Sequence, residues 1–229
     1  MVLGGLQKLT LLDFPEHVAC TVFTLGCNFR CPFCHNASLV RTEDTPQYAV
    51  DAFFQFLEKR KGLLDGVAVT GGEPLLQKGI EDFLERIKVM GYAVKLDTNG
   101  AFPEKLESIL KNGLCDYVAM DIKNAKAKYE MTAGAKNILP AVEKSAALLM
   151  EGKTPFEFRT TAARELHNAE DFRDIGQWIA GVSRYYIQQF QDSGDLLEAG
   201  FTSPSEEEMH AYLHSVKEFV PLAELRGLS

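Results

Sequence analysis

Three of the chain's five cysteines stand in one short segment, at Cys27, Cys31 and Cys34, with the spacing C-x3-C-x2-C. Thiolates are soft ligands that select zinc, copper(I) or iron–sulfur clusters. Structural zinc sites usually close with four protein ligands, and cubane clusters are usually held by four thiolates. Three thiolates on a cubane leave one iron open, and an open position is where a metal site does chemistry. The segment therefore predicts one [4Fe-4S] cluster whose three ligands are also the catalytic cysteines.

A zinc site is the alternative interpretation of the same segment. Its fourth ligand would be His35 or a distant residue, and the protein would then be a non-enzymatic binding module. Cys20 and Cys115 are poor candidates for that ligand, because both lie in apolar runs of the kind that bury free cysteines. The spacing leaves both interpretations open. Clustered cysteines in a chain without a signal peptide indicate a metal site in a reducing compartment rather than disulfides.

The elements that must position this segment alternate along the whole chain. Six short runs rich in Val, Phe, Tyr and Ile predict strands that are buried on both faces. The segments between them have apolar residues at a period of 3.6, which predicts helices. Thr45 and Pro46 are expected to begin the first helix, and a capping box starting at Ser203 is expected to begin the last. The strands are expected at 18–25, 66–70, 93–96, 116–120, 156–160 and 184–189.

Regular alternation of strands and helices predicts an α/β fold with a parallel sheet and right-handed crossovers. A closed (β/α)8 barrel needs eight strand–helix units and usually about 250 residues. This chain has 229 residues and six units, so we expect a partial (β/α)6 TIM-like barrel, open at one side. We expect one domain over residues 1–229, with an N-terminal extension at 1–17, the core at 18–190, and a C-terminal loop and helix at 191–229.

The composition narrows the partners and the compartment. The chain is 46% hydrophobic and 24% charged, and its formal net charge is −8. A negative net charge argues against nonspecific binding to nucleic acid or to an anionic membrane surface. No apolar run approaches the roughly 20 residues that a membrane span needs, and the N-terminus lacks the pattern of a signal peptide. We therefore expect a cytoplasmic protein with neither a nucleic-acid nor a membrane partner.

A glycine-rich turn follows the second predicted strand. In parallel α/β folds the ligand site lies at the carboxyl ends of the strands, which is where Gly71, Gly72 and Glu73 stand. Glycine has no Cβ, so the backbone here is expected to approach a ligand closely, and the Glu73 carboxylate suits an ammonium group. The alternative is a plain strand-to-helix turn that binds nothing.

Charged side chains follow the next two strands, at Asp97, Asp121 and Lys123, and the fifth strand carries Arg159. Lys123 and Arg159 match the oxygens of a carboxylate or a ribose, and arginine binds such oxygens bidentately. The alternative is a purely structural set of ion pairs at the barrel rim. Residues two apart on a strand point to the same side, so Asp121 and Lys123 are expected to face the barrel interior together. Phe33 is expected either to pack on an adenine ring or to shield the cluster.

Several segments together resemble one enzyme family. The segment from Cys27 to Asn36 resembles the cluster loop of radical S-adenosylmethionine (SAM) enzymes and, within them, of glycyl-radical-enzyme activases. Leu96-Asp97-Thr98-Asn99-Gly100 and Asp121-Ile122-Lys123 resemble the same group, which includes pyruvate formate-lyase activating enzyme. The chain is most similar to the longer form of anaerobic ribonucleoside-triphosphate reductase activating protein, at residues 4–8, 13–15, 156–161 and 188–190.

This resemblance implies a radical SAM fold in which SAM binds the open iron through its amino and carboxylate groups. An electron from a flavodoxin- or ferredoxin-type donor would cleave SAM to methionine and a 5′-deoxyadenosyl radical. That radical would take a hydrogen from a backbone glycine of a partner, a glycyl radical enzyme. The cofactor-binding residues expected are Phe33, Gly71, Gly72, Glu73, Asp97, Thr98, Asp121, Lys123 and Arg159.

Formate-lyase activases also carry a monovalent cation near SAM. By the resemblance, Asp97, Thr98, Asp121 and the Ala119 carbonyl would hold it here. The sixth strand departs from the formate-lyase activases, which offer a histidine to SAM where this chain has two glutamines, Gln188 and Gln189. A second interpretation is a radical SAM enzyme that acts on a small molecule, such as a deazapurine-forming synthase.

Overall fold

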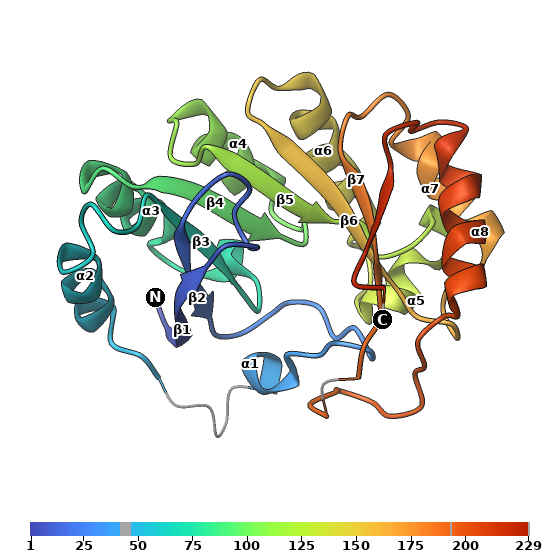
Figure 1. The fold of residues 1–229 in the computed structure, drawn as a ribbon, viewed down its shortest axis with the longest axis horizontal. Helices are drawn as coiled ribbons and strands as arrows, with labels where there is room; N and C mark the ends of the chain where they lie inside the picture. Colours follow the sequence, from blue (N-terminus) through green and yellow to red (C-terminus); the bar gives the residue numbers. More distant parts are fainter. Residues whose placement is uncertain (42–46, 193, 229) are drawn as a thin grey trace.

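The computed structural model describes residues 1–41, 47–192 and 194–228, and its fold is built on one eight-stranded sheet (Figure 1). The strands pair in the order of the sequence. β2 to β8 are parallel, and β1 is antiparallel to β2. The strands are β1 (Leu3–Thr10), β2 (Ala19–Thr24), β3 (Gly66–Gly71), β4 (Ala93–Thr98), β5 (Tyr117–Asp121), β6 (Phe156–Ala162), β7 (Tyr185–Gln189) and β8 (Glu224–Arg226).

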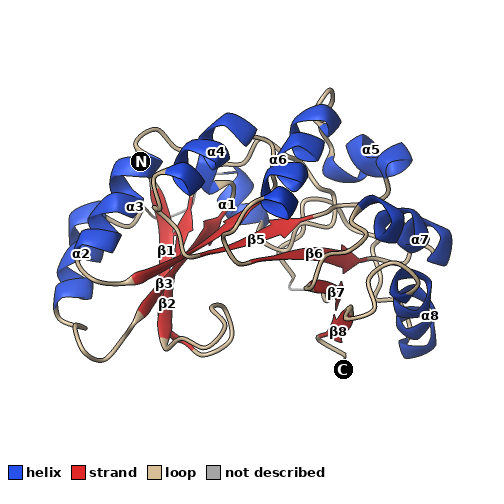
Figure 2. Cartoon of the chain, turned by 90° about the horizontal axis from the view of Figure 1, so that it is seen from above, coloured by secondary structure: helices blue, strands red, loops and turns tan. Residues whose placement is uncertain are grey.

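The sheet curves into an open barrel with helices along its outer side (Figure 2). β1 and β8 are the two edges of the sheet, so the barrel is not closed. This confirms the predicted partial barrel with a mainly parallel sheet. The helices bury apolar stripes against the sheet, which is why their 3.6-residue period was visible in the sequence. They are α1 (Ala37–Arg41), α2 (Val50–Glu58), α3 (Ile80–Val89), α4 (Pro103–Lys111), α5 (Tyr129–Ala133), α6 (Leu139–Glu151), α7 (Ala169–Trp178) and α8 (Glu206–Lys217).

Both edge strands lie in segments where the sequence predicted no strand. β1 begins with two glycines in its first three residues, and three of its later residues are exposed, so it lacks the composition of a buried strand. β8 has only three residues, two of them charged, and pairs with β7 from Tyr186 to Gln188. These strands add an antiparallel hairpin at one edge and a short parallel strand at the other.

Two expected helix starts were misplaced. α2 begins at Val50 after Ala49, so its start lies beyond Thr45 and Pro46, which are outside the described residues. α8 begins at Glu206 with a capping box between Ser205 and Glu208, two residues later than the box expected at Ser203. In the described part of the chain, no helix combines the length and apolar content that crossing a bilayer requires.

The amino-terminal end of the barrel is plugged by a small apolar cluster. Phe14, from the loop between β1 and β2, packs with Ala19, Tyr117 and Ala93, which are the first residues of β2, β5 and β4. The Phe14 and Tyr117 rings have centroids 6.3 Å apart. Asp97, Asp121 and Arg159 line the pocket at the opposite end, near the carboxyl ends of the strands. The pocket therefore opens at that end.

Candidate active site

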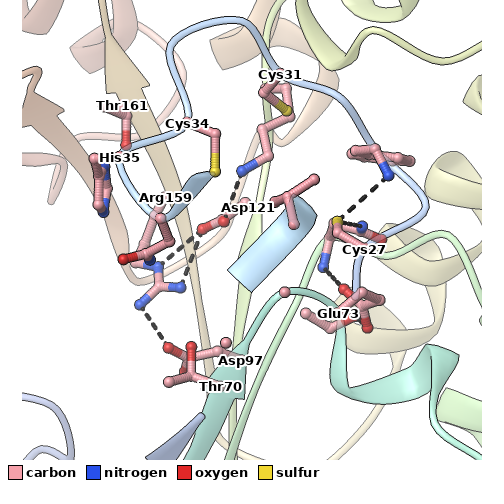
Figure 3. Close-up of a pocket in the computed structure, with 18 of the residues that line it drawn as sticks. Cys27, Cys31, Cys34, His35, Thr70, Glu73, Asp97, Asp121, Arg159 and Thr161 are labelled. Atoms are coloured by element: carbon pink, nitrogen blue, oxygen red, sulfur yellow. Dashed lines mark hydrogen bonds and ion pairs between the residues drawn. The ribbon is translucent and has the colours of Figure 1, made fainter. Parts of the chain in front are cut away.

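One pocket of about 240 Å³ lies at the carboxyl ends of the strands and collects most of the predicted site residues (Figure 3). All three clustered cysteines line it. Glu73 lies on the side of Cys27, whereas Asp97, Asp121 and Arg159 gather on the other side of the view. The lining residues are Cys27, Phe29, Cys31, Phe33, Cys34, His35, Asn36, Val40, Thr70, Gly71, Gly72, Glu73, Asp97, Thr98, Asn99, Asp121, Lys123, Arg159, Thr161 and Gln188.

The cysteine segment is a loop between β2 and α1, and backbone hydrogen bonds hold its start and its middle. The Gly26 amide donates to the Leu39 carbonyl at 2.8 Å, and the Arg30 amide donates to the Ala133 carbonyl at 2.9 Å. At Gly134 a Cβ would stand 2.2 Å from the Arg30 carbonyl oxygen, so only glycine lets the end of α5 support the loop. The loop that carries the three cysteines is thus tied to α1 and to the end of α5.

The thiols are held in an apolar, partly covered environment. The Phe29 amide donates to the Cys27 sulfur at 3.3 Å, and the Asn99 side-chain amide approaches it at 3.8 Å. Burial raises the pKa of Cys27 to about 11 and that of Cys31 to about 12, although the nearby Lys123 charge acts in the opposite direction. A metal centre is therefore what would keep these groups as thiolates.

The donor set fits a cluster with three protein ligands. All five cysteines of the chain are free thiols, and Cys20 and Cys115 are buried in the core away from the pocket lining. Over the described ranges, no three His, Cys, Asp or Glu side chains converge on a single metal-ion position. Three soft donors on the wall of one pocket, with polar groups opposite them, leave room for a further ligand on the exposed face of a cluster.

The glycine turn after β3 packs against the start of the cysteine loop. A Cβ on Gly71, whose φ is +123°, would lie 2.3 Å from the Thr24 amide nitrogen. A Cβ on Gly72 would lie 2.0 Å from the Gly26 carbonyl oxygen. That same oxygen accepts the Glu73 amide at 2.9 Å. Both glycines line the pocket, as a ligand-approaching turn would. A Cβ on Gly71 would also collide with the end of β2, and a Cβ on Gly72 with the loop that carries Cys27.

Glu73 joins the turn after β3 to the turn after β4. Its side chain is fully buried and accepts hydrogen bonds from the Leu75 amide at 3.0 Å, the Thr98 hydroxyl at 2.8 Å and the Asn99 amide at 2.7 Å. Burial raises the pKa of this carboxyl to about 7 against the effect of these donors. Both carboxylate oxygens thus have partners within the protein, so Glu73 holds Asn99 beside Cys27 as well as lining the pocket.

A network of ion pairs crosses the other half of the pocket. The Arg159 guanidinium lies 3.2 Å from Asp97 and 3.1 Å from Asp121, and Lys123 lies 2.8 Å from the second oxygen of Asp121. Lys95 pairs with the second oxygen of Asp97. These opposite charges hold the pKa values of both aspartates below, and those of Lys123 and Arg159 above, their usual ranges despite burial. Asp121 and Lys123 share the interior side, as the strand geometry indicated.

Phe33 has a supporting role in the wall of the pocket. It is almost fully buried, and its ring meets His167 and Phe190 edge-on, with centroids 6.3 and 6.4 Å away. Of the two glutamines on β7, Gln188 lines the pocket, whereas the Gln189 amide donates to the Pro204 carbonyl at 2.8 Å.

Sequence reasoning left Asn99 out of the site, although it lies closest to the cluster loop among the residues after β4. Its side-chain amide donates to Asn28 at 3.0 Å and approaches the Cys27 sulfur. The available signal was its position, in the turn that follows the predicted strand at 93–96 and directly before Gly100. Thr70, Thr161 and Asn36 also line the pocket without having been proposed as binding residues, and so does His35, which was considered only as a zinc ligand.

An open parallel barrel with three cysteines on its carboxyl rim is the arrangement of a cluster-dependent barrel enzyme. A family model described as the radical SAM superfamily matches residues 21–170, which contain the cysteine loop and the charged network. The chain therefore belongs to the radical SAM superfamily, and membership implies a [4Fe-4S] cluster and SAM as its cofactors. This confirms the predicted enzyme class and fold.

Individual relatives are similar over different lengths. A protein of Methanocaldococcus jannaschii with the provisional name glycyl-radical enzyme activating enzyme is 29% identical, over 100% of this chain and 97% of its own length. The pyruvate formate-lyase-activating enzyme of Listeria monocytogenes is 30% identical over 53% of each chain. A domain of pyruvate-formate lyase-activating enzyme from Bacteroides vulgatus has the same fold, with a TM-score of 0.57, 22% identity, and coverage of 71% of this chain and 99% of that one.

Proposed function

We propose that this protein is a radical SAM activase that generates a glycyl radical on a partner enzyme. The observation that carries the proposal is the end-to-end similarity to the M. jannaschii activating enzyme, together with a pocket in which three thiols face a set of polar groups. The pyruvate formate-lyase-activating enzyme of L. monocytogenes, similar over 53% of this chain, supports the same activity.

The two halves of the pocket have different proposed roles, one in holding the cluster and the other in binding SAM. Cys27, Cys31 and Cys34 would hold the cluster, which when bound supplies the electron that cleaves SAM to methionine and a 5′-deoxyadenosyl radical. Lys123 carries three N–H donors, of which Asp121 accepts one, so it retains donors for the SAM carboxylate or ribose. Arg159 faces the same space and donates to both Asp121 and Asp97, so we assign it the positioning of those carboxylates.

The partner we propose is a glycyl radical enzyme, and the resemblance of residues 4–8, 156–161 and 188–190 favours anaerobic ribonucleoside-triphosphate reductase. The sheet is open between β1 and β8, which leaves a side through which a glycine-bearing loop could reach the pocket. A flavodoxin- or ferredoxin-type protein would supply the electron. Free thiols at all five cysteines suit the reducing cytoplasm in which we place the reaction.

Electron paramagnetic resonance tests this function directly. The cluster-loaded protein is incubated without oxygen with SAM, a reductant and a candidate glycyl radical enzyme, and the expected result is the doublet of a glycyl radical. The matched control is Cys34→Ala, which should give neither the radical nor 5′-deoxyadenosine. SAM cleavage without a protein radical on any candidate would refute the activase proposal.

A small-molecule radical SAM enzyme is the second candidate. The GTP 3′,8-cyclase of Helicobacter pylori is 31% identical over 53% of this chain, although the match spans only 40% of the cyclase. This candidate predicts that SAM cleavage is stimulated by a metabolite and that no protein radical forms. A zinc module predicts protein that binds zinc and yields no iron or sulfide after anaerobic reconstitution.

A further inference from the structure

A lysine lies beneath the charged network, in the interior of the barrel. Lys95 is on β4 two residues before Asp97, so both side chains point to the same face of the sheet. The Lys95 side chain is only 1% exposed, and its ammonium pairs with Asp97. Below it lies the apolar plug that contains Ala93 and Tyr117. Burying a lysine side chain is costly unless a partner offsets its desolvation, and Asp97 is that partner here.

The groups expected to hold a monovalent cation are already engaged. Asp97 directs one carboxylate oxygen to Lys95 and the other to Arg159. Asp121 directs one oxygen to Arg159 and the other to Lys123. The same partners are seen as ion pairs within 3.2 Å or less.

The two remaining groups have partners as well. The Thr98 hydroxyl donates to Glu73 at 2.8 Å and accepts the Gly100 amide at 3.1 Å, on the face of β4 opposite Asp97. Ala119 lies inside the sheet, paired with Asp97 on β4 and with Glu157 on β6. The residues present therefore do not fit a bound monovalent cation.

The charges of the network also disfavour a bound monovalent cation. Two carboxylates face three cationic side chains, Lys95, Lys123 and Arg159, so the group already carries one excess positive charge. A further cation between these carboxylates would be repelled by an ammonium and a guanidinium at short range, where little water screens the interaction. Without Lys95, the two aspartates and the two remaining cations would balance, and Asp97 would have one oxygen free.

We propose that the Lys95 ammonium takes the place of a bound alkali ion, as a built-in cation that holds Asp97 and, through Asp97, the Arg159 guanidinium. Lys95 is thus a positioning residue of the SAM site, and the proposal rests on that site being the one described above. The consequence is that the native protein needs neither potassium nor sodium to order this half of the pocket.

The experiment measures which cations stabilise the protein, without SAM present. Cluster-loaded protein is melted without oxygen in 150 mM potassium, sodium or tetramethylammonium chloride, the last of which is too bulky for the buried position. Thallium(I) NMR probes binding of an alkali-like ion directly. For the native protein we expect melting temperatures within about 1 °C of each other in the three salts, and no bound-thallium signal.

Two substitutions of Lys95 separate charge from space. Lys95→Ala frees an oxygen of Asp97 and opens room for an ion, so potassium or sodium should raise its melting temperature by about 3–6 °C over tetramethylammonium if the salt is tenfold above the dissociation constant. Lys95→Met removes the same charge but fills the space, and should show no such recovery. Lys88→Ala, which breaks the outer Lys88–Asp116 pair, is the control for loss of a lysine elsewhere.

Either of two results would overturn the proposal. One is an alkali-specific stabilisation or a thallium signal in the native protein. The other is a Lys95→Ala protein that melts alike in all three salts, which would make Lys95 an ordinary structural partner of Asp97. If Lys95→Ala does not fold, the double variant Lys95→Ala with Asp97→Asn removes both charges and should melt at the same temperature in every salt. The melting temperatures and the thallium signal of the native protein test the proposal in either case.

The same proteins separate this proposal from the proposed function. Native protein should cleave SAM equally well in potassium and tetramethylammonium, whereas Lys95→Ala should need an alkali ion. If no SAM is cleaved under any condition but the melting results are as expected, the activase function fails and the role of Lys95 in the network stands.

Discussion

Substitution of Gly72 by alanine tests whether this glycine serves the ligand or the protein's own cluster loop. The added Cβ would lie 2.0 Å from the Gly26 carbonyl oxygen and 2.6 Å from its carbon, and the backbone must shift to relieve this contact. The shift would strain or break the 2.9 Å hydrogen bond from the Glu73 amide to Gly26. Loss of that bond costs about 0.5–1.5 kcal/mol, and overpacking costs about 1–3 kcal/mol, so we expect a total of roughly 2–4 kcal/mol.

Urea unfolding of the metal-free protein measures this cost, and iron and sulfide analysis after anaerobic reconstitution measures its effect on the cluster. Because Gly26 directly precedes Cys27, we expect Gly72→Ala to lower cluster content as well as stability. Gly5→Ala is the matched control, since a Cβ there would meet only the Phe23 side chain, at 3.8 Å. A stable Gly72→Ala protein with a full cluster and weak SAM binding would refute this reasoning and restore the ligand-approach explanation.

Three further predictions concern the cysteines, the charged network and the buried carboxyl. Cys31→Ala should abolish the reconstituted cluster in iron and sulfide analysis, whereas Cys20→Ala should retain it; loss of the cluster in Cys20→Ala would contradict the assignment. Lys123→Met should keep the cluster and weaken SAM binding in calorimetry by about 1.5–3 kcal/mol, and a lower melting temperature with unchanged binding would assign Lys123 to structure alone. The Glu73 carboxyl titrates near 4.5 when unfolded and at about 7 when folded, so its stabilising effect is complete below pH 4.5 and is lost as the pH rises through 7. The free energy of unfolding of metal-free Glu73→Gln protein, measured in urea at a series of pH values, should therefore lack this part of the pH dependence. An unchanged pH dependence would contradict the raised pKa.

The interior strands and the cluster loop could be predicted from sequence because burial leaves a strong pattern. Six interior strands are mostly buried and appear in the sequence as short runs rich in Val, Ile, Phe and Tyr, and all six were found within a few residues of their expected bounds. The edge strands β1 and β8 left no such pattern, because one side of an edge strand faces solvent or a loop. Their existence depends on hydrogen bonds offered by β2 and β7, which no local pattern in the sequence records.

For the site, the sequence likewise predicted which residues come together but not all of the contacts between them. Cysteine spacing and charges at strand ends predicted which residues would meet, since parallel strands bring their carboxyl ends together. Their partners were harder to predict. Lys95 stands in a run of apolar residues, Ala93-Val94-Lys95-Leu96, and only the structure shows that its ammonium turns inward to Asp97. The contact that leaves no room for a side chain at Gly72 likewise involves a residue 46 positions earlier, through the Gly26 carbonyl.

The contacts that build the pocket also compensate for the open side of the barrel. A closed barrel holds each strand end through neighbours on both sides, whereas here β1 and β8 are edges. At the rim, Glu73 ties β3 to β4, and Arg159 ties β6 to both β4 and β5 through two aspartates. These links are polar and lie in the pocket itself, so the positions of the strand ends and of the binding groups are coupled. A substitution that frees Arg159 from Asp97 should therefore loosen the fold and the SAM site together, whereas removal of Lys123, which bridges only within the β5 end, should affect binding more than stability.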